Sequence, residues 1–240
     1  MRRIRLIAAS ACLVALCLAF GACGSSTGSP SDQASVRSGI NKNYLSKDLD
    51  VKTWVERFSS ESREVYTLRD EIVKRLDLKA GDAHADIGAG TGIFLAPFAR
   101  AVGPSGKLYP VDIAPNFLDY LRGRVANEGL TQAEVVTGLE DSIELPEASI
   151  DSAFVCDTYH HFEYPQRSLA SIFKALRPGG RFFVIDFHRI PGVSSDFILG
   201  HVRVNQETFV SEIQAAGFVL EEELEVEGMV ENYMLHFRRP

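Results

Sequence analysis

Hydrophobic positions along the chain follow two different patterns, and the change lies near residue 83. Before it, apolar side chains recur at steps of three, four and seven, which predicts one or two leading helices that pack on a core. These residues are Trp54, Phe58, Val65, Leu68, Ile72 and Leu76. After it, short apolar runs alternate with helical stretches, which is typical of parallel strands joined by crossover helices on both faces of a sheet. Strands are expected near 83–87, 107–112, 132–137, 149–157 and 181–187, and helices near 92–102, 115–127, 166–176 and 206–216.

The end of the chain predicts a hairpin in place of another crossover. The stretches FVLEEELEV (218–226) and ENYMLHFRR (231–239) alternate apolar and polar residues, and too few residues separate them for a connecting helix. Gly217, which precedes them, is expected to end the last helix as a left-handed cap. The predicted fold class is therefore α/β: a three-layer, Rossmann-like sandwich around a seven-stranded, mostly parallel sheet with an antiparallel last strand.

The amino-terminal stretch has the features of an export signal. Three arginines precede an apolar run over about residues 6–20, and small residues follow, which is the order of a secretory signal. FGAC (20–23) followed by Gly-Ser-Ser resembles a bacterial lipoprotein cleavage box, in which Cys23 becomes the lipidated first residue. Ordinary cleavage after residue 21 remains the alternative, because Phe20 stands where that box usually has leucine.

These features predict three parts of the chain: a signal peptide at 1–22, a flexible polar tether at 23–43 and one folded domain at 44–240. The expected location is therefore outside the cytoplasm, as a lipoprotein anchored on the periplasmic side of the membrane through Cys23. A cytoplasmic protein is the alternative if the start site is misassigned.

The net charge and the number of cysteines argue against a nucleic-acid partner and against an internal disulfide. The formal net charge is −7, and no basic run follows residue 5, so the sequence predicts no nucleic-acid partner. Cys12 and Cys17 lie in the predicted signal and Cys23 at its cleavage site, which leaves Cys156 alone in the folded domain. No internal disulfide is then expected.

A glycine-rich turn follows the first expected strand. Gly88, Gly90 and Gly92 let the backbone bend sharply and approach a ligand with no side chain in the way. In an open parallel sheet, ligands bind beyond the carboxyl ends of the strands. Asp112 ends the next strand about twenty residues on, where a carboxylate can accept both hydroxyls of a ribose. The combination predicts a nucleoside cofactor.

The spacing of the glycines favours a positively charged cofactor. A dinucleotide fingerprint has a third glycine where this sequence has Ile93. Asp86, just before the turn, would repel a pyrophosphate but suits an ammonium or a sulfonium. An NAD-linked oxidoreductase of Rossmann topology is therefore disfavoured, although it remains an alternative.

ADIGAGTG, VDI and LRPGGRFFVIDF together resemble the motifs of class I S-adenosylmethionine-dependent methyltransferases. The resemblance covers about residues 60–240 and implies S-adenosylmethionine as cofactor. It implies that Asp86, Gly88 and Gly90 hold the methionine part and that Asp112 holds the ribose. Leu139 stands where an acid usually meets adenine, so the resemblance leaves Glu140 and Asp141 as the two candidates. It also implies that Asp157 faces the methyl donor and the substrate.

Three histidines are candidate general bases. His160 and His161 follow the fourth expected strand, on the side where an acceptor should arrive, and His188 follows the fifth. One of the two adjacent histidines is expected to point away. These residues could converge with His201 and Glu163 on a metal, but their spacing fits no compact ligand motif, so no metal is predicted.

The predicted function is transfer of the methyl group of S-adenosylmethionine to a small-molecule acceptor by in-line displacement. The alternatives are the NAD-linked oxidoreductase and an exported nucleoside-binding protein without turnover. The acceptor atom and the oligomeric state cannot be predicted from these residues.

Overall fold

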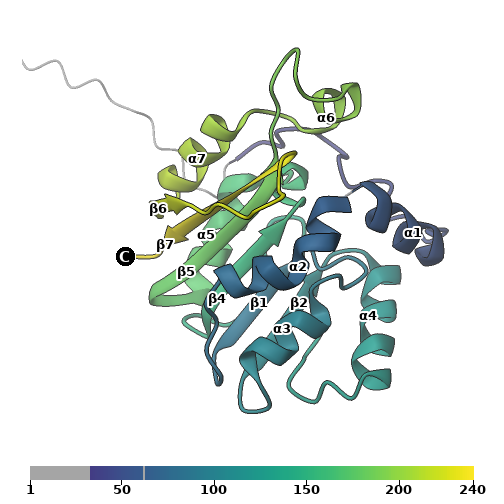
Figure 1. Cartoon of the computed structure of the whole chain (residues 1–240), viewed down its shortest axis with the longest axis vertical. Helices are drawn as coiled ribbons and strands as arrows, with labels where there is room; N and C mark the ends of the chain where they lie inside the picture. The colour runs from purple at the N-terminus through teal and green to yellow at the C-terminus, as the bar shows by residue number, and fades with distance from the viewer. Residues whose placement is uncertain (1–32, 62) are drawn as a thin grey trace, which may run out of the picture.

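A computed structural model describes residues 33–61 and 63–240, in which seven strands form a single sheet. The strands are β1 (Ala83–Ile87), β2 (Lys107–Asp112), β3 (Val136–Thr137), β4 (Ile150–Cys156), β5 (Leu176–Phe187), β6 (Val219–Glu223) and β7 (Asn232–Arg238). Their order across the sheet is β3-β2-β1-β4-β5-β7-β6. The first five strands pair in parallel, whereas β7 runs antiparallel to both β5 and β6 (Figure 1). The predicted fold class and terminal hairpin are confirmed. The predicted signal peptide, Cys23 and the first part of the predicted tether lie outside the described residues.

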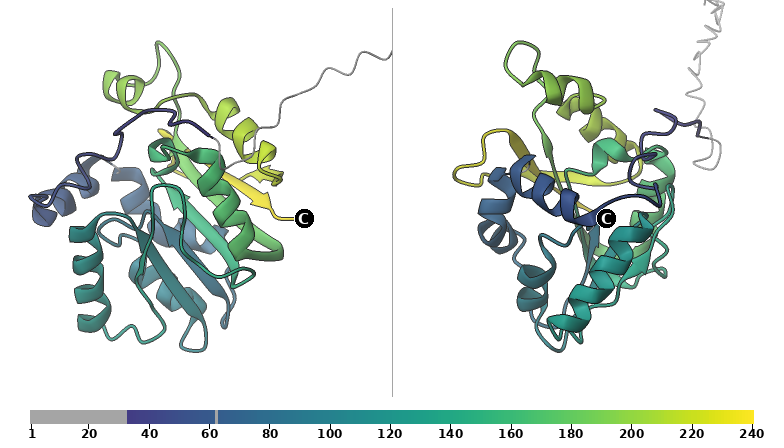
Figure 2. Two further views of the ribbon diagram at one scale, coloured as in Figure 1. Left: turned by 180° about the vertical axis from the view of Figure 1, so that it is seen from behind. Right: turned by 90° about the vertical axis from the view of Figure 1, so that its right-hand side faces the viewer.

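Helices cover both faces of the sheet. They are α1 (Val51–Glu61), α2 (Arg63–Arg75), α3 (Leu95–Val102), α4 (Pro115–Asn127), the 3₁₀ turn η2 (Tyr159–His161), α5 (Pro165–Ala175), α6 (Asp196–His201) and α7 (Gln206–Ala215). Buried side chains of α2 and α3 share one apolar cluster, and those of α5 and α7 share the other. Figure 1 shows α2 and α3 in front of the sheet. The left view of Figure 2, from behind, shows α5 and α7 on the opposite face.

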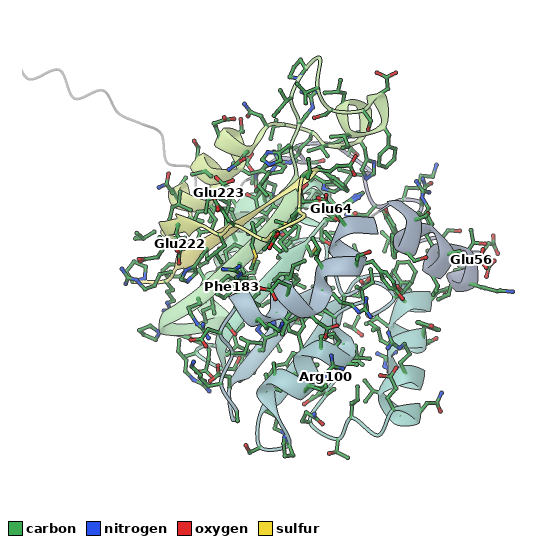
Figure 3. All side chains as sticks on the ribbon, viewed as in Figure 1. Glu56, Glu64, Arg100, Phe183, Glu222 and Glu223 are labelled. Atoms are coloured by element: carbon green, nitrogen blue, oxygen red, sulfur yellow. The ribbon has the colours of Figure 1, made fainter. Side chains whose placement is uncertain are left out.

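The core is split by the alternation of side chains along the central strands. Phe154 of β4 and Phe183 of β5 pack with α2 and α3, and Figure 3 labels Phe183. Their neighbours Val155 and Val184 pack with α5 and α7. Both faces of these strands are therefore buried, which is why they form nearly continuous apolar runs in the sequence.

Two elements are shorter than the sequence predicts. The helix expected from residue 92 begins at Leu95, because Gly92 has φ +78° and still belongs to the turn. The strand expected at 132–137 is regular only at Val136–Thr137. The amide of Leu108 bonds to the Gln132 carbonyl, but Pro110, two residues on, has no N–H to continue the ladder.

Two segments outside the central strands, residues 33–43 and 230–232, are held by hydrogen bonds to the rest of the domain. Glu64 of α2, labelled in Figure 3, accepts backbone N–H bonds from Val230 and Glu231, which precede β7, and from Asn232, its first residue. Within the range predicted as a tether, residues 33–43 contact the domain. Gly39 donates its N–H to the Glu163 carboxylate at 3.0 Å. Among residues 33–61 and 63–240, no helix has both the length and the apolar character needed to cross a bilayer.

Candidate active site

A pocket lies where β1, β2 and β4 end, and the glycine turn forms one part of its wall. The turn is anchored on β2, since the N–H groups of Gly88 and Ala89 both donate to the Val111 carbonyl, at 2.8 and 3.0 Å. Gly88 has φ +73° and Gly90 has φ +54°, conformations that favour glycine. A Cβ on Gly88 would lie 2.3 Å from Cγ2 of Thr158, so this position has no room for a side chain.

Asp112 shapes the turn as well as lining the pocket. Its Oδ2 accepts the N–H of Gly90 at 2.7 Å, and its Oδ1 accepts the N–H of Ala114 at 2.8 Å. Each carboxylate oxygen can accept a second hydrogen bond, so the group can also meet the hydroxyls of a ribose. Burial raises the pKa of Asp112, while its backbone hydrogen bonds oppose the rise.

Asp86 is the second buried carboxyl group in the pocket wall, with 4% of its surface exposed. Burial, and then the charge of Asp112, raises its pKa to about 7. A cation bound beside Asp86 would offset both effects. The side chain is therefore suited to hold an ammonium group.

The structure separates the two acids predicted for adenine. Glu140 lines the pocket. Asp141 forms an ion pair with Arg167 and is not among the described residues that line the pocket. This placement favours Glu140, whose role stays a prediction. Asp157 lines the pocket with a left-handed backbone (φ +47°), and its Oδ1 accepts the Asn232 side-chain amide at 2.6 Å.

His160 and His161 both line the pocket, so the expectation that one of them points away is wrong. The reason is the 3₁₀ turn, in which successive side chains are separated by a third of a revolution, whereas in a strand they alternate. His201 of α6 joins them, with its Nε2 3.2 Å from Nε2 of His161. His188 lies outside the lining as far as the described residues define it, and its ring packs on Tyr233.

Hydrogen bonding and burial fix the states of these rings. Nδ1 of His160 lies 2.8 Å from Oδ1 of Asp186, and the His160 N–H donates to Oδ2 of the same residue at 3.1 Å. An ionised carboxylate only accepts, so Nδ1 of His160 carries the hydrogen in this bond. Burial and the neighbouring histidines lower the pKa of His161 to about 2 and that of His201 to about 4. Both rings are therefore neutral at pH 7.

These residues fit S-adenosylmethionine. The turn at Gly88 and Gly90 offers backbone where a Cβ would collide with a neighbouring side chain. Asp86 and Asp112 place two buried carboxyl groups where an amino acid and a ribose can be held close together. Asp86 also gives the pocket a negative charge at neutral pH once a cation is bound beside it. A pyrophosphate would find no opposite charge there, because none of the described residues that line the pocket is a lysine or an arginine.

Comparison with known proteins agrees with this geometry. Residues 85–184 match the model of a methyltransferase domain. The chain is 27% identical over 118 residues to the ubiquinone/menaquinone biosynthesis C-methyltransferase UbiE of a Marinomonas species, covering 49% of this chain and 47% of that protein. It is 35% identical over 110 residues to an uncharacterised 37.1 kDa protein in a transposon of Streptomyces fradiae, covering 46% of this chain and 31% of that protein. The chain thus spans less than half the length of these two curated relatives.

The fold also resembles that of solved structures. An S-adenosylmethionine-dependent methyltransferase from Aquifex aeolicus superposes with a TM-score of 0.70 at 21% identity, covering 80% of this chain and all of that one. A likeness at 21% identity shows the fold alone. The sequence motifs and the lining of the pocket are what indicate the cofactor. Together the comparisons show that residues 85–184 match a methyltransferase domain and that the chain has the fold of a solved S-adenosylmethionine-dependent methyltransferase.

Proposed function

We propose that the protein transfers the methyl group of S-adenosylmethionine to a small, largely apolar acceptor. The observation that carries this proposal is that a single pocket is lined by two sets of residues. We call the glycine turn with Asp86 and Asp112 its cofactor end, and the three histidines with the aromatic side chains around them its acceptor end. The histidines and aromatic rings suit a small acceptor, whereas the pyrophosphate of a nicotinamide dinucleotide would find no lysine or arginine among the described residues that line the pocket.

The residues at the cofactor end have separable tasks. Asp86 holds the ammonium group, Asp112 accepts hydrogen bonds from the ribose, and Glu140 meets the adenine. When bound, S-adenosylmethionine supplies a methyl group on a positively charged sulfur. The acceptor's lone pair forms the new bond to the methyl carbon as the carbon–sulfur bond breaks, and the sulfur leaves as a neutral thioether. Positioning is the main contribution that the protein must make, because such a methyl group is already activated.

The lining of the other end supports an aromatic acceptor. The rings of Phe187 and Phe197 pack near His160 and His201, and the ring of Tyr44 meets the ring of His161 edge to face at 5.1 Å. The UbiE relatives are named for a C-methylation in quinone biosynthesis, which is consistent with an aromatic ring as acceptor. We therefore propose acceptors that combine an aromatic or other apolar body with an ionisable group.

Cofactor binding and product release test the proposal. Titration calorimetry and thermal melting of the purified protein should show binding and stabilisation by S-adenosylmethionine and none by NADH. Incubation with a panel of phenols, hydroquinones and thiols should release S-adenosylhomocysteine with at least one of them. Stabilisation by NADH alone would favour the oxidoreductase alternative. Cofactor binding without release from any acceptor would favour the binding protein.

The affinity for S-adenosylmethionine is expected to rise with pH up to about pH 7. Below its pKa of about 7, Asp86 is protonated in the free protein and must lose that proton to hold an ammonium. The affinity should therefore fall by at most about tenfold for each pH unit below 7. Cys156, whose thiol lies near Asp86, stays neutral in this range because burial and neighbouring carboxylates raise its pKa. Calorimetry between about pH 5 and pH 7 measures the slope, and Asp86→Asn should flatten it.

The raised pKa of Asp86 also predicts how the stability of the free protein changes with pH. A carboxyl group whose pKa is raised by folding contributes stability that is fully present below its unfolded pKa and is lost as pH rises through its folded pKa. Melting of the free parent should therefore shift downward relative to Asp86→Asn as the pH rises from about 4 to about 8. Parallel melting curves of the two proteins across this range would contradict the assignment.

We also propose that the protein is exported and anchored through lipidated Cys23. The support is the order of charged, apolar and small residues before Cys23 and the polar residues after it. A lipidated cysteine with several acyl chains should hold the protein in the membrane fraction, where a single chain would bind only marginally. Cys23→Ser should move it to the soluble fraction or stall its processing. Recovery of the parent from the cytoplasm with its amino terminus beyond residue 30 would contradict export.

A further inference from the structure

We propose that His160, His161 and His201 bind a divalent transition-metal ion, with zinc as the best-suited ion, and that this ion takes the ionisable oxygen or sulfur of the methyl acceptor. The metal site stands on the geometry of the three histidines. Only its use in binding an acceptor rests on the proposed function.

The three side chains already stand close to a ligand arrangement. One ring nitrogen from each lies within 4.8 Å of the others, and the Nε2 atoms of His161 and His201 are 3.2 Å apart. A tetrahedral zinc ion with bonds near 2.0–2.1 Å holds its nitrogen ligands about 3.3 Å from one another. The pair formed by His161 and His201 already has this separation, and the ring nitrogen of His160, which lies within 4.8 Å of them, must approach by up to about 1.5 Å.

Asp186 orients His160 in the way that metal sites commonly use. A metal-binding histidine typically gives its other N–H to a carboxylate, which fixes the ring and leaves the ligating nitrogen free. Nδ1 of His160 meets Asp186 at 2.8 Å, and both side chains are almost fully buried, with 1% and 0% exposed. Asp186 is itself held by the N–H groups of His160 and Phe187. The orientation of His160 therefore does not depend on a ligand.

Unsatisfied nitrogens in this cluster point to a missing partner. Nε2 of His160 and Nδ1 of His161 are buried without a hydrogen bond to any part of the chain that the structure describes. A hydrogen bond between His161 and His201 would explain their short contact but leaves both of these nitrogens unpaired. A buried polar atom without a partner destabilises the folded protein. A metal ion would give Nε2 of His160 its partner, while Nδ1 of His161 would stay unpaired because His161 ligates through Nε2.

Three protein ligands leave a coordination position open, which is typical of catalytic rather than structural zinc. All three histidines line the same pocket as the glycine turn, so the open position faces the space where an acceptor must lie. A bound hydroxyl or thiol loses its proton to solvent more easily because the ion stabilises the anion. The ion would therefore do the work predicted for a histidine general base, and it selects acceptors that offer a phenolic oxygen or a thiol.

Metal binding by the purified full chain tests the site. After treatment with a chelator and dialysis, zinc titration followed by elemental analysis should give one ion per chain. His161→Gln and His201→Gln should each weaken zinc binding by at least about 100-fold, and Asp186→Asn by about 10–100-fold. His188→Gln is the matched control, because this histidine lies outside the pocket lining and should leave zinc binding unchanged. His201 is only partly buried on α6, so its variant should keep the parent's melting temperature in the absence of metal.

Two results would overturn the site: a parent that retains no zinc, or a folded His201→Gln variant that binds zinc as tightly as the parent. Cobalt(II) provides an independent measurement, since three nitrogen ligands in a tetrahedral site give it strong visible absorption. That spectrum should appear in the parent and in His188→Gln and be lost in His201→Gln.

A chromogenic phenol tests the role of the ion. The zinc-loaded parent should bind 4-nitrocatechol as its anion, with the matching shift in absorbance, and zinc-free parent and His201→Gln should not. No shift with loaded parent would overturn the acceptor role. S-adenosylmethionine binding is measured separately on metal-free protein, because Asp86 and Asp112 need no metal. If the protein binds zinc but not S-adenosylmethionine, the proposed function is wrong and the zinc site remains. If it binds S-adenosylmethionine but not zinc, the zinc site is wrong and the proposed function remains.

Discussion

Replacing Gly88 with alanine is expected to weaken S-adenosylmethionine binding by at least about 100-fold, equivalent to about 2.7 kcal/mol. Two effects act together. The residue has φ +73°, where an L side chain costs about 1–2 kcal/mol. The new Cβ would also lie 2.3, 2.6 and 2.9 Å from three atoms of the Thr158 side chain. The turn or Thr158 must therefore move, and both form part of the pocket wall.

Gly129 provides the control for backbone strain. Its φ of +64° is close to that of Gly88, but no atom lies within 4 Å of the position that a Cβ would take. Gly129→Ala should therefore lower stability by about 1 kcal/mol and leave cofactor affinity unchanged. The double variant Gly88→Ala with Thr158→Gly removes the overlapping atoms and should regain part of the affinity. Calorimetry on the variants, with melting curves to confirm folding, makes the comparison. A folded Gly88→Ala protein with the parent's affinity would show that the turn does not contact the cofactor.

The cofactor end of the pocket could be predicted because its residues follow strands that the sequence identifies. β1 and β2 are short strands whose positions the sequence predicts correctly. Asp86, the glycine turn and Asp112 can therefore be placed from their position along the chain alone. The carboxyl ends of neighbouring parallel strands meet at one edge, which brings these segments together without further information.

The acceptor end could not be predicted in the same way. His201 lies 40 residues after His161, on α6, a six-residue helix without a strong apolar pattern. Asp186 reads as an ordinary strand residue until pairing of β4 with β5 brings it beside the 3₁₀ turn that carries His160. Residues 33–43 read as a polar tether, yet Asn41 is buried and donates to the His161 carbonyl. Each of these contacts depends on tertiary packing between distant segments, which the local sequence of either segment does not predict.

Asp112 gives the second large effect, because it joins the cofactor to the turn. Asp112→Ala removes the acceptor for the Gly90 N–H, at 2.7 Å, and for the Ala114 N–H, at 2.8 Å, together with the predicted bonds to the ribose. Hydrogen bonds to charged groups contribute about 1.5–3 kcal/mol each, so affinity for S-adenosylmethionine should fall by at least about 100-fold.

Asp112→Asn separates the two tasks of this side chain. An amide can still bond to ribose hydroxyls, since it offers one acceptor and one donor group. In either orientation, however, its NH₂ would face the N–H of Gly90 or of Ala114, because both carboxylate oxygens of Asp112 now accept backbone bonds. We therefore expect Asp112→Asn to lose nearly as much affinity as Asp112→Ala, with the turn loosened in both. Asp119→Asn, an exposed change on α4, serves as the control and should bind like the parent. If calorimetry instead finds that a folded Asp112→Asn protein retains the parent's affinity, Asp112 acts on the ribose alone and the turn is held without it.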